Sequence, residues 1–419
     1  MPMTKSSGPA ASGRSTLTVL GVHVSSEAYP TVKHRVRALL QSAEISVQEI
    51  NYPLAARLSQ QGRRSPLRRP FAVAASGLRL LASHVRAVVA FLRARTAGAL
   101  YVPYPAILVL YLLSLLPKRR RPAAVYCDAF ISLYDTVVRD RKLIRAASPL
   151  AAVLRHVEAR AYRFADQVIV DTPLNADCMA RDFGLAPEKF VAVPLSINER
   201  AYAPKPYRPR PGICNVLFVG TFAPLQGVDV VARAAGLLSD DASLRFRIIG
   251  TGQTADRVAE ILAASPSVHC EWDRTWRSAG ELSGAIREAD VCLGIFGEGD
   301  KAQRVWPLKN YAYMAVGRTL VTGDTRCARA MTAEPSAAPF VTVPIGDPRA
   351  LADAILSLSR DGRMREEYSR RARAYYEERL SSAVSMSRLY AVVAGRSAAA
   401  AGARSRAPGR QNDNGEEAR

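Results

Sequence analysis

The sequence predicts an α/β protein with two doubly wound parallel sheets, each in its own domain. Three observations support this prediction. Strand-like apolar runs alternate with helix-like stretches along most of the chain, which is the pattern of parallel strands joined by helical crossovers. A length of 419 residues suggests about two domains. A segment dense in proline and polar residues, 196–213, separates two similar strand–helix series and is expected to be the interdomain linker.

The first series predicts an N-terminal α/β domain over residues 16–195, preceded by a disordered segment at 1–15. Its strands are expected near 17–23, 45–50, 98–102, 123–127 and 167–171. A long helix is expected at 71–95, because apolar residues recur there at helical spacing, namely at Leu78, Leu81, Val85, Val88 and Leu92.

A basic stripe follows the same helix, since Arg79, Arg86 and Arg93 recur every seven residues. Residues 1–170 carry 25 Lys and Arg against 8 Asp and Glu, within a net charge of +21 for the whole chain. This imbalance favours a polyanionic neighbour, although a charged stripe is also typical of a solvated helix face. We interpret it as a membrane-docking face on the acceptor side, together with Arg63, Arg64, Arg68, Arg69 and residues 118–121. Nucleic acid is disfavoured because aromatic residues are not interleaved with the basic runs.

The apolar segment 99–116 is the one candidate for a membrane span. Pro103 and Pro105 interrupt it, and the remaining helix is shorter than the roughly 20 residues that a span needs. We therefore expect a strand, a turn and a buried helix there. The N-terminus lacks an apolar signal region, and the six cysteines show no C-x-x-C pairing. These features predict a cytoplasmic protein that associates peripherally with the inner face of the plasma membrane.

The second series predicts a C-terminal α/β domain over residues 214–365, then a helix at 366–395 and a disordered tail at 396–419. Its strands are expected near 215–220, 245–250, 267–271, 290–296, 319–323 and 340–343. The alternation with helical stretches again indicates a parallel sheet.

Residues 294–324 form the most informative part of this second half. A buried strand ends there, a glycine-rich charged loop follows, and a helix begins. In open α/β sheets ligands bind at the carboxyl ends of the strands, and helix N-termini attract anions. Lys301, Arg304 and Lys309 lie within nine positions of one another. The segment therefore predicts a site for a phosphate-bearing ligand.

The same segment resembles the donor site of the retaining GT-B glycosyltransferases of the family 4 type, the glycosyl transferases group 1. Pro307, Lys309, Ala315 and Gly317 match the pattern, whereas Ala312 and Arg304 stand where that family carries its paired glutamates. Upstream, residues 215–227 resemble the strand and loop that usually read G-R-L-x-x-x-K-G, with Thr221 in place of the arginine and Gln226 in place of the lysine. The resemblance covers roughly residues 15–395.

This resemblance implies a GT-B architecture, with two Rossmann-like domains facing across a cleft and the last helix packing back on the N-terminal domain. It implies glycosyl transfer from a nucleotide-diphosphate sugar to a glycan or lipid-linked acceptor, with retention and without a metal or other cofactor. Lys309 and Arg304 would stabilise the departing diphosphate, and Asp128 would lie near the sugar. The donor-binding residues are expected to be Gly220, Thr221, Gly227, Gly250, Gly252, Glu298, Lys301 and Pro307. Ser25 and Ser26 would line the acceptor side. Such an enzyme would serve polysaccharide or glycoconjugate biosynthesis.

Two other hypotheses stay open. The run from Gly250 to Ala255 fits the dinucleotide fingerprint G-x-G-x-x-A, with Glu271 about 20 residues further on, and so allows an NAD(P)-dependent oxidoreductase. The same turn would also suit donor contact or a plain tight turn. The absent paired glutamates allow a non-catalytic GT-B-fold protein that binds a partner or glycan, although the three cations of the loop favour transfer.

Overall fold

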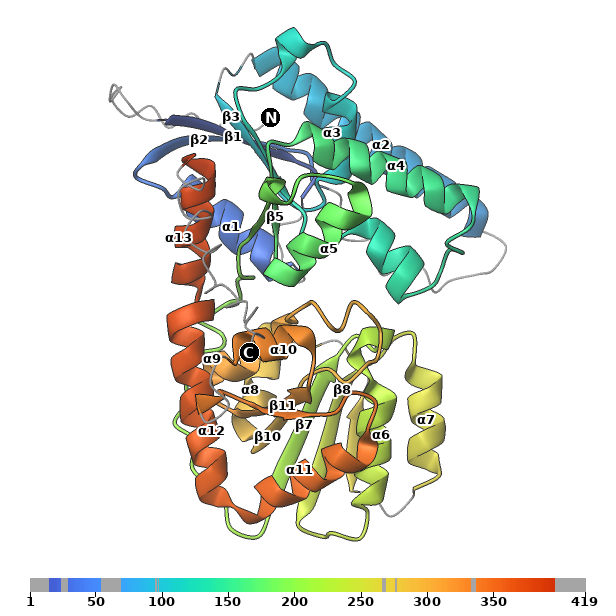
Figure 1. Cartoon of the computed structure of the whole chain (residues 1–419), viewed down its shortest axis with the longest axis vertical. Coiled ribbons are helices and arrows are strands. Elements are labelled where there is room, and N and C mark those ends of the chain that lie inside the picture. The colour runs from blue at the N-terminus through green and yellow to red at the C-terminus, as the bar shows by residue number, and fades with distance from the viewer. Residues whose placement is uncertain are drawn as a thin grey trace, which may run out of the picture.

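The computed structural model describes residues 15–23, 29–53, 69–94, 96, 98–265, 269–275, 277–332 and 337–395. Two α/β domains follow one another along the long axis of the molecule (Figure 1). Each domain is built on one six-stranded sheet, and all the strand pairs of both sheets are parallel. The predicted fold class is therefore confirmed.

The first sheet has the strand order β2-β1-β3-β4-β5-β6. Its strands are β1 Ser15–Gly21, β2 Ile45–Asn51, β3 Ala99–Val102, β4 Val125–Asp128, β5 Gln167–Val170 and β6 Phe190–Ala192. The central strands read as continuous apolar runs because helices cover both faces of the sheet, so that every side chain of the strand is buried. Leu100, Tyr101 and Val102 of β3 are all fully buried.

Helices cover both faces of this sheet. The helical segments are α1 Pro30–Leu40, α2 Arg69–Ala94, α3 Ile107–Leu113, η4 Lys118–Arg120, η5 Asp135–Asp140, α4 Pro149–Phe164, α5 Pro173–Phe183 and η6 Pro187–Lys189. The core on one face includes residues of α2 to α5, and the core on the other includes residues of α1. Residues 99–116 form the predicted strand and short buried helix, and no helix among the described residues is long and apolar enough to cross a membrane.

The second sheet has the order β12-β11-β10-β7-β8-β9. Its strands are β7 Cys214–Gly220, β8 Leu244–Gly250, β9 Cys270–Asp273, β10 Val291–Leu293, β11 Thr319–Gly323 and β12 Val341–Val343. Its helical segments are η7 Pro224–Gln226, α6 Val228–Leu237, α7 Ala255–Ala263, α8 Ala279–Glu288, α9 Leu308–Val316, α10 Arg326–Met331 and α11 Pro348–Arg360.

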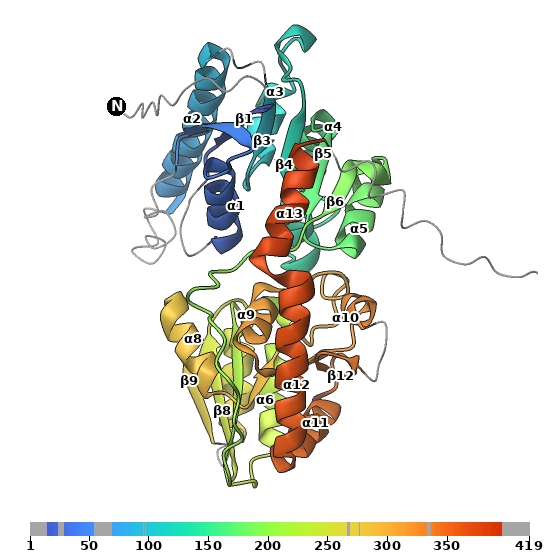
Figure 2. The same cartoon turned by 90° about the vertical axis from the view of Figure 1, so that its left-hand side faces the viewer.

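The last helices connect the two domains. They are α12 Gly362–Tyr375, the π-helical η9 Tyr376–Leu380 and α13 Ser382–Val393. Figure 2 shows α12 beside the second domain and α13 beside the first. Leu389 and Val392 of α13 join the core of the first domain, and the Tyr390 hydroxyl donates a hydrogen bond to the Ala38 carbonyl at 2.7 Å.

The long helix is present, but the sequence pattern misplaced part of its buried face. The predicted apolar series includes Leu78, Leu81 and Val85, which are exposed in the structure. Val88 of that series does join the core, together with Ala87 and Phe91, and Leu92 packs against it. The reason is that this helix carries apolar residues on two of its sides, and only one of them can face the sheet.

Candidate donor site between the domains

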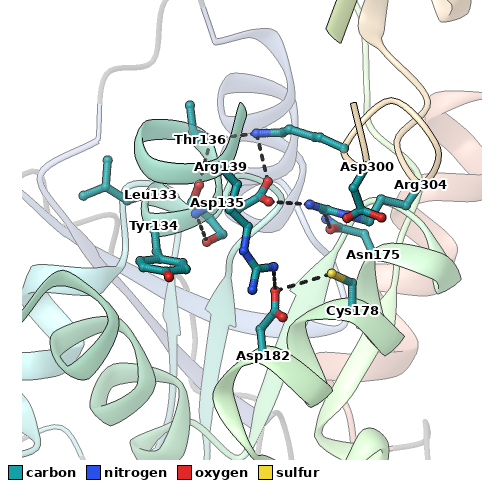
Figure 3. Close-up of polar contacts among 12 residues, drawn as sticks. Leu133, Tyr134, Asp135, Thr136, Arg139, Asn175, Cys178, Asp182, Asp300 and Arg304 are labelled. Atoms are coloured by element: carbon teal, nitrogen blue, oxygen red, sulfur yellow. Dashed lines mark hydrogen bonds and ion pairs between the residues drawn. The ribbon is translucent and has the colours of Figure 1, made fainter. Parts of the chain in front are cut away.

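The candidate site lies where loops at the carboxyl ends of the two sheets meet. The loop after β10 provides Lys301 and Arg304, and the segment after β4 provides Asp135 and Thr136 (Figure 3). The Lys301 ammonium donates a hydrogen bond to the Thr136 hydroxyl at 2.7 Å and lies 3.2 Å from the Asp135 carboxylate. These contacts join the two domains across the cleft.

Arg304 is the centre of this interdomain network. Its guanidinium forms an ion pair with Asp135, donates to the Asn175 side-chain oxygen at 2.6 Å, and lies 3.1 Å from Asp300. Only 2% of the residue is exposed. Burial opposes its charge, but Asp135, Cys178 and Asp300 together outweigh burial and raise the pKa of Arg304 above its usual value. Arg304 therefore already has carboxylate partners. It was predicted to contact a departing diphosphate, but in this structure its guanidinium is paired with Asp135 instead.

The segment η5 lies against the loops that were predicted to hold the donor. Gln253 of the second domain donates to the Arg141 carbonyl at 3.0 Å. The backbone N–H of Leu225 donates to the Asp140 carboxylate, whose pKa is raised mainly by burial. Together with Asp135, this puts two carboxylates of the first domain beside the glycine-rich loops of the second.

Lys309 stands apart from the other two cations. It lies in the first turn of α9, with its ammonium nitrogen buried 3.6 Å from the centre of the Phe218 ring. Within the described part of the chain this nitrogen has no hydrogen-bond partner. Burial lowers the pKa of Lys309 well below its usual value. Its charged form is disfavoured because buried ammonium groups are normally paired, and among the described residues the Phe218 ring face is the group found beside this nitrogen.

Other unsatisfied polar atoms accompany Lys309 at the start of α9. The side-chain oxygen and nitrogen of Asn310 and the indole nitrogen of Trp306 are buried without a hydrogen-bond partner in the described residues. Pro307 is the N-cap residue and provides no side-chain cap. Because buried polar atoms are nearly always paired, this group of unpaired atoms at a helix N-terminus is the candidate place for a ligand. The sequence pattern singled out Lys309 and Pro307 but missed Asn310 and Trp306, for which it offers no signal.

The predicted glycine-rich loops pack against one another by their backbones. Gly227 has φ +59°, and a Cβ atom there would lie 2.6 Å from the Gly297 nitrogen. The Phe296 and Gly297 N–H groups donate to carbonyls of this loop at 3.1 and 3.2 Å. At the next strand end, a Cβ atom on Gly250 would lie 1.8 Å from the Gly220 carbonyl oxygen. Gly220, Thr221 and Gly252 thus belong to a compact set of turns at the carboxyl edge of the second sheet.

In the structure, Glu271 does not lie where the acidic residue of a dinucleotide site is expected. Glu271 lies opposite Arg247 in the ladder, three residues before Gly250, and its carboxylate is 3.6 Å from the Arg247 guanidinium. Glu271 lies within β9, and the acidic residue at the carboxyl end of β9 is Asp273, which accepts hydrogen bonds from Thr275 and Arg277. Glu271 therefore does not reach the edge at which a ribose would lie, which counts against the oxidoreductase hypothesis.

Asp128 does not face the cleft. It is fully buried, and its carboxylate accepts hydrogen bonds from Arg35 at 2.8 Å and from the Tyr101 hydroxyl at 2.7 Å. Arg35 also donates to the Val193 and Pro194 carbonyls. The predicted contact of Asp128 with a transferring sugar therefore has no support from the geometry, because both carboxylate oxygens are used inside the first domain.

The remaining predicted residues are spread over the surface. Glu298 is exposed and lies beside Gly346. Arg79, Arg86 and Arg93 are exposed on α2. Ser25 and Ser26 lie outside the described residues, as do Arg63, Arg64 and Arg68.

Asp171 extends the network within the first domain and is expected to make stability depend on pH. Its buried carboxylate accepts a hydrogen bond from Asn175 at 2.8 Å, and burial raises its pKa to about 6. A carboxyl group with a raised folded pKa contributes stability that is full below about pH 4 and is lost as the pH rises through about 6. We expect Asp171→Asn to gain about 1–2 kcal/mol of unfolding free energy relative to wild type between pH 4 and pH 7. Urea unfolding at several pH values measures this.

The exposed Asp177 on α5, the helix that carries Asn175, provides the control for this prediction. Asp177→Asn should leave the pH profile of wild type unchanged. A profile for Asp171→Asn that runs parallel to wild type would show that the Asp171 carboxyl is not protonated in the folded protein at pH 5.

Comparison with known proteins agrees with this architecture. Residues 214–361 match the family model of the glycosyl transferases group 1. No curated protein sequence matches the chain. Sucrose-phosphate synthase from Thermosynechococcus elongatus has a similar structure, with a TM-score of 0.64 and 15% identity over 92% of this chain and 100% of that one. HepE from Anabaena, in complex with UDP and glucose, has a TM-score of 0.62 and 11% identity over 91% of this chain and 100% of its own.

A third solved structure is similar over a smaller part. A TarM mutant from S. aureus, in complex with fondaparinux, alpha-GlcNAc-glycerol and UDP, has a TM-score of 0.52 and 13% identity over 70% of this chain and 55% of TarM. The chain thus matches about half the length of TarM. At these identities the structural likeness establishes the fold alone. Residues 214–361 are similar to the glycosyl transferases group 1, and the chain as a whole has the two-domain GT-B fold.

Proposed function

We propose that this protein transfers a sugar from a nucleotide-diphosphate sugar to a glycan or lipid-linked acceptor, with retention of configuration. The observation that carries the proposal is the buried, unpartnered ammonium of Lys309 at the N-terminus of α9, beside the unsatisfied amide of Asn310. A diphosphate would supply both the negative charge and the acceptor oxygens that these groups lack. The likeness of this segment to retaining enzymes supports the retention part of the proposal.

The donor chemistry is supported by the bound molecules of similar proteins. The HepE and TarM structures contain UDP. In transfer, the bond between the anomeric carbon and the diphosphate oxygen breaks, and a bond to the acceptor oxygen forms. Negative charge then develops on the leaving diphosphate, which Lys309 and the dipole of α9 would balance without a metal ion. Lys301 and Arg304 would join them only after Asp135 releases these cations.

The acceptor would bind to the first domain at the cytoplasmic face of the membrane, as suits polysaccharide or glycoconjugate biosynthesis. The excess of 25 basic over 8 acidic residues in the first 170 positions supports this placement. A glycan or lipid carrier that bears phosphate would be attracted by such a domain.

We expect Lys309→Met to weaken binding of the nucleotide diphosphate about tenfold to a hundredfold. The reason is that a charge-assisted contact to phosphate is lost, while a methionine side chain still fills the space beside Phe218. Isothermal titration of wild type and variant with UDP, GDP and ADP measures the loss and identifies the base. Lys205→Met is the matched control, because Lys205 is exposed in the linker.

Three results would speak against the proposal. Equal affinity of wild type and Lys309→Met for the nucleotide diphosphate would show that Lys309 does not contact this ligand. Binding of NAD(P) in place of every nucleotide diphosphate would favour the oxidoreductase. Absence of binding by any of these ligands would favour the non-catalytic protein, in agreement with Ala312, which lies in the hydrophobic core where the family's glutamate is expected.

A further inference from the structure

Helix α2 presents an apolar stripe to solvent. Leu78 is 69% exposed, and Leu81, Val85 and Val89 are 43%, 43% and 37% exposed. With about 100° of rotation per residue, these four side chains fall in one narrow arc of the helix. The core takes Ala87, Val88 and Phe91 from the adjoining side of α2, and only Leu92 near the end of the helix continues the stripe into the core. Single exposed apolar residues are common, but a continuous stripe of four along one helix calls for a partner.

A row of arginines borders this stripe. Arg79, Arg86 and Arg93 are exposed and recur every two turns on one flank of it. None of the three forms an ion pair with a carboxylate among the described residues. From Ile50 to Cys127 the chain contains 13 Lys and Arg residues and no Asp or Glu. The charge of this flank is therefore uncompensated by the sequence around it.

The location of α2 leaves the stripe accessible. Figure 2 shows α2 along the outer side of the first domain, away from the second domain. The basic turn η4 lies at the end of the first domain farthest from the second, as both views show. Lys118, Arg119 and Arg120 are exposed there, and Leu115 just before them is 55% exposed. Basic and apolar side chains thus occur together at two neighbouring elements.

We propose that the α2 stripe docks this protein on an anionic lipid bilayer. Leucine and valine side chains would enter the boundary between headgroups and acyl chains, and the arginine row would contact lipid phosphates. A second copy of the chain fits less well, because two stripes facing each other would bring their uncompensated arginines together. This inference rests on the proposed function and deepens it, because it names an anionic lipid bilayer as the partner of the first domain.

Sedimentation of the full chain with vesicles tests this proposal. Vesicles of phosphatidylcholine mixed with phosphatidylglycerol should bind wild type, and pure phosphatidylcholine vesicles should bind it far less. Replacing Arg79, Arg86 and Arg93 together by alanine should weaken binding roughly a hundredfold. Leu81→Ser with Val85→Ser should weaken it about tenfold or more, since their burial in the bilayer is lost.

Matched controls keep the outcome decisive. Arg257, Arg363 and Arg370 of the second domain are exposed, and their joint replacement by alanine changes the net charge by the same amount. Leu150→Ser with Val153→Ser changes two exposed apolar residues of α4. The proposal is overturned if wild type does not bind anionic vesicles, or if these controls weaken binding as much as the α2 variants. It is also overturned if the α2 apolar variant abolishes a dimer in analytical ultracentrifugation and leaves vesicle binding intact.

Nucleotide titration of the same preparations separates this inference from the proposed function. The α2 variants should keep the UDP affinity of wild type. Vesicle binding without nucleotide binding would support the docking surface and contradict the transferase proposal. Nucleotide binding without vesicle binding would support the transferase proposal and contradict the docking surface.

Discussion

Asp128→Ala is expected to lower the unfolding free energy by about 3–5 kcal/mol, because it leaves the buried guanidinium of Arg35 without its counter-ion. Arg35 and Asp128 are both 0% exposed, and their side chains lie 2.8 Å apart. The pair joins α1 to β4, and Tyr101 of β3 adds a hydrogen bond at 2.7 Å. Chemical unfolding, followed by a probe of the first domain, measures the loss.

A double-mutant cycle identifies the cause of this loss. The combined variant Arg35→Met with Asp128→Ala should be clearly less destabilised than the sum of the two single variants, because it removes both charges from the core. Additive losses would mean that the two side chains act independently. A stable Asp128→Ala protein that has lost transfer alone would place Asp128 at the sugar, as the sequence suggested.

Asp135→Ala is expected to shift the equilibrium between closed and open domains by roughly a hundredfold toward the open form. Asp135 is the carboxylate that balances both Lys301 and Arg304 at the domain interface. Without it, Lys301 and Arg304 of the second domain lose the carboxylate that they share with the first domain, at a cost of about 3 kcal/mol. Small-angle X-ray scattering should show a larger radius of gyration for the variant than for wild type.

The ion pair of Arg139 with Asp182 provides the control for domain closure, because both of its members belong to the first domain. Asp182→Ala should leave the scattering profile unchanged. The interdomain role of Asp135 would be contradicted by an unchanged profile for Asp135→Ala, or by the same expansion in both variants.

The predicted donor residues rest on local sequence patterns, and the predicted acceptor residues do not. Lys309 and Pro307 follow a local motif, and the structure places both at the start of α9. Gly227 and Gly250 also follow local rules, since their backbones approach neighbouring loops too closely for a side chain. Asn310 and Asn175 carried no such signal, because an asparagine in a helix has no distinctive spacing.

The sequence by itself determined the fold class, the order along the chain of all the strands except β6, and the presence of a long helix before β3. Apolar periodicity and loop chemistry are local properties, and they suffice for these features.

The tertiary structure alone decided which charged groups are paired within the protein and which remain available to a ligand. Arg304 meets Asp135 across 169 residues of sequence, and Arg35 meets Asp128 across 93, whereas Lys309 meets no carboxylate among the described residues. It also decided that Leu81 and Val85 face solvent, since periodicity cannot tell which apolar side of a helix the sheet will cover. Ion pairing and burial depend on distant parts of the chain coming together, so no local pattern could have specified them.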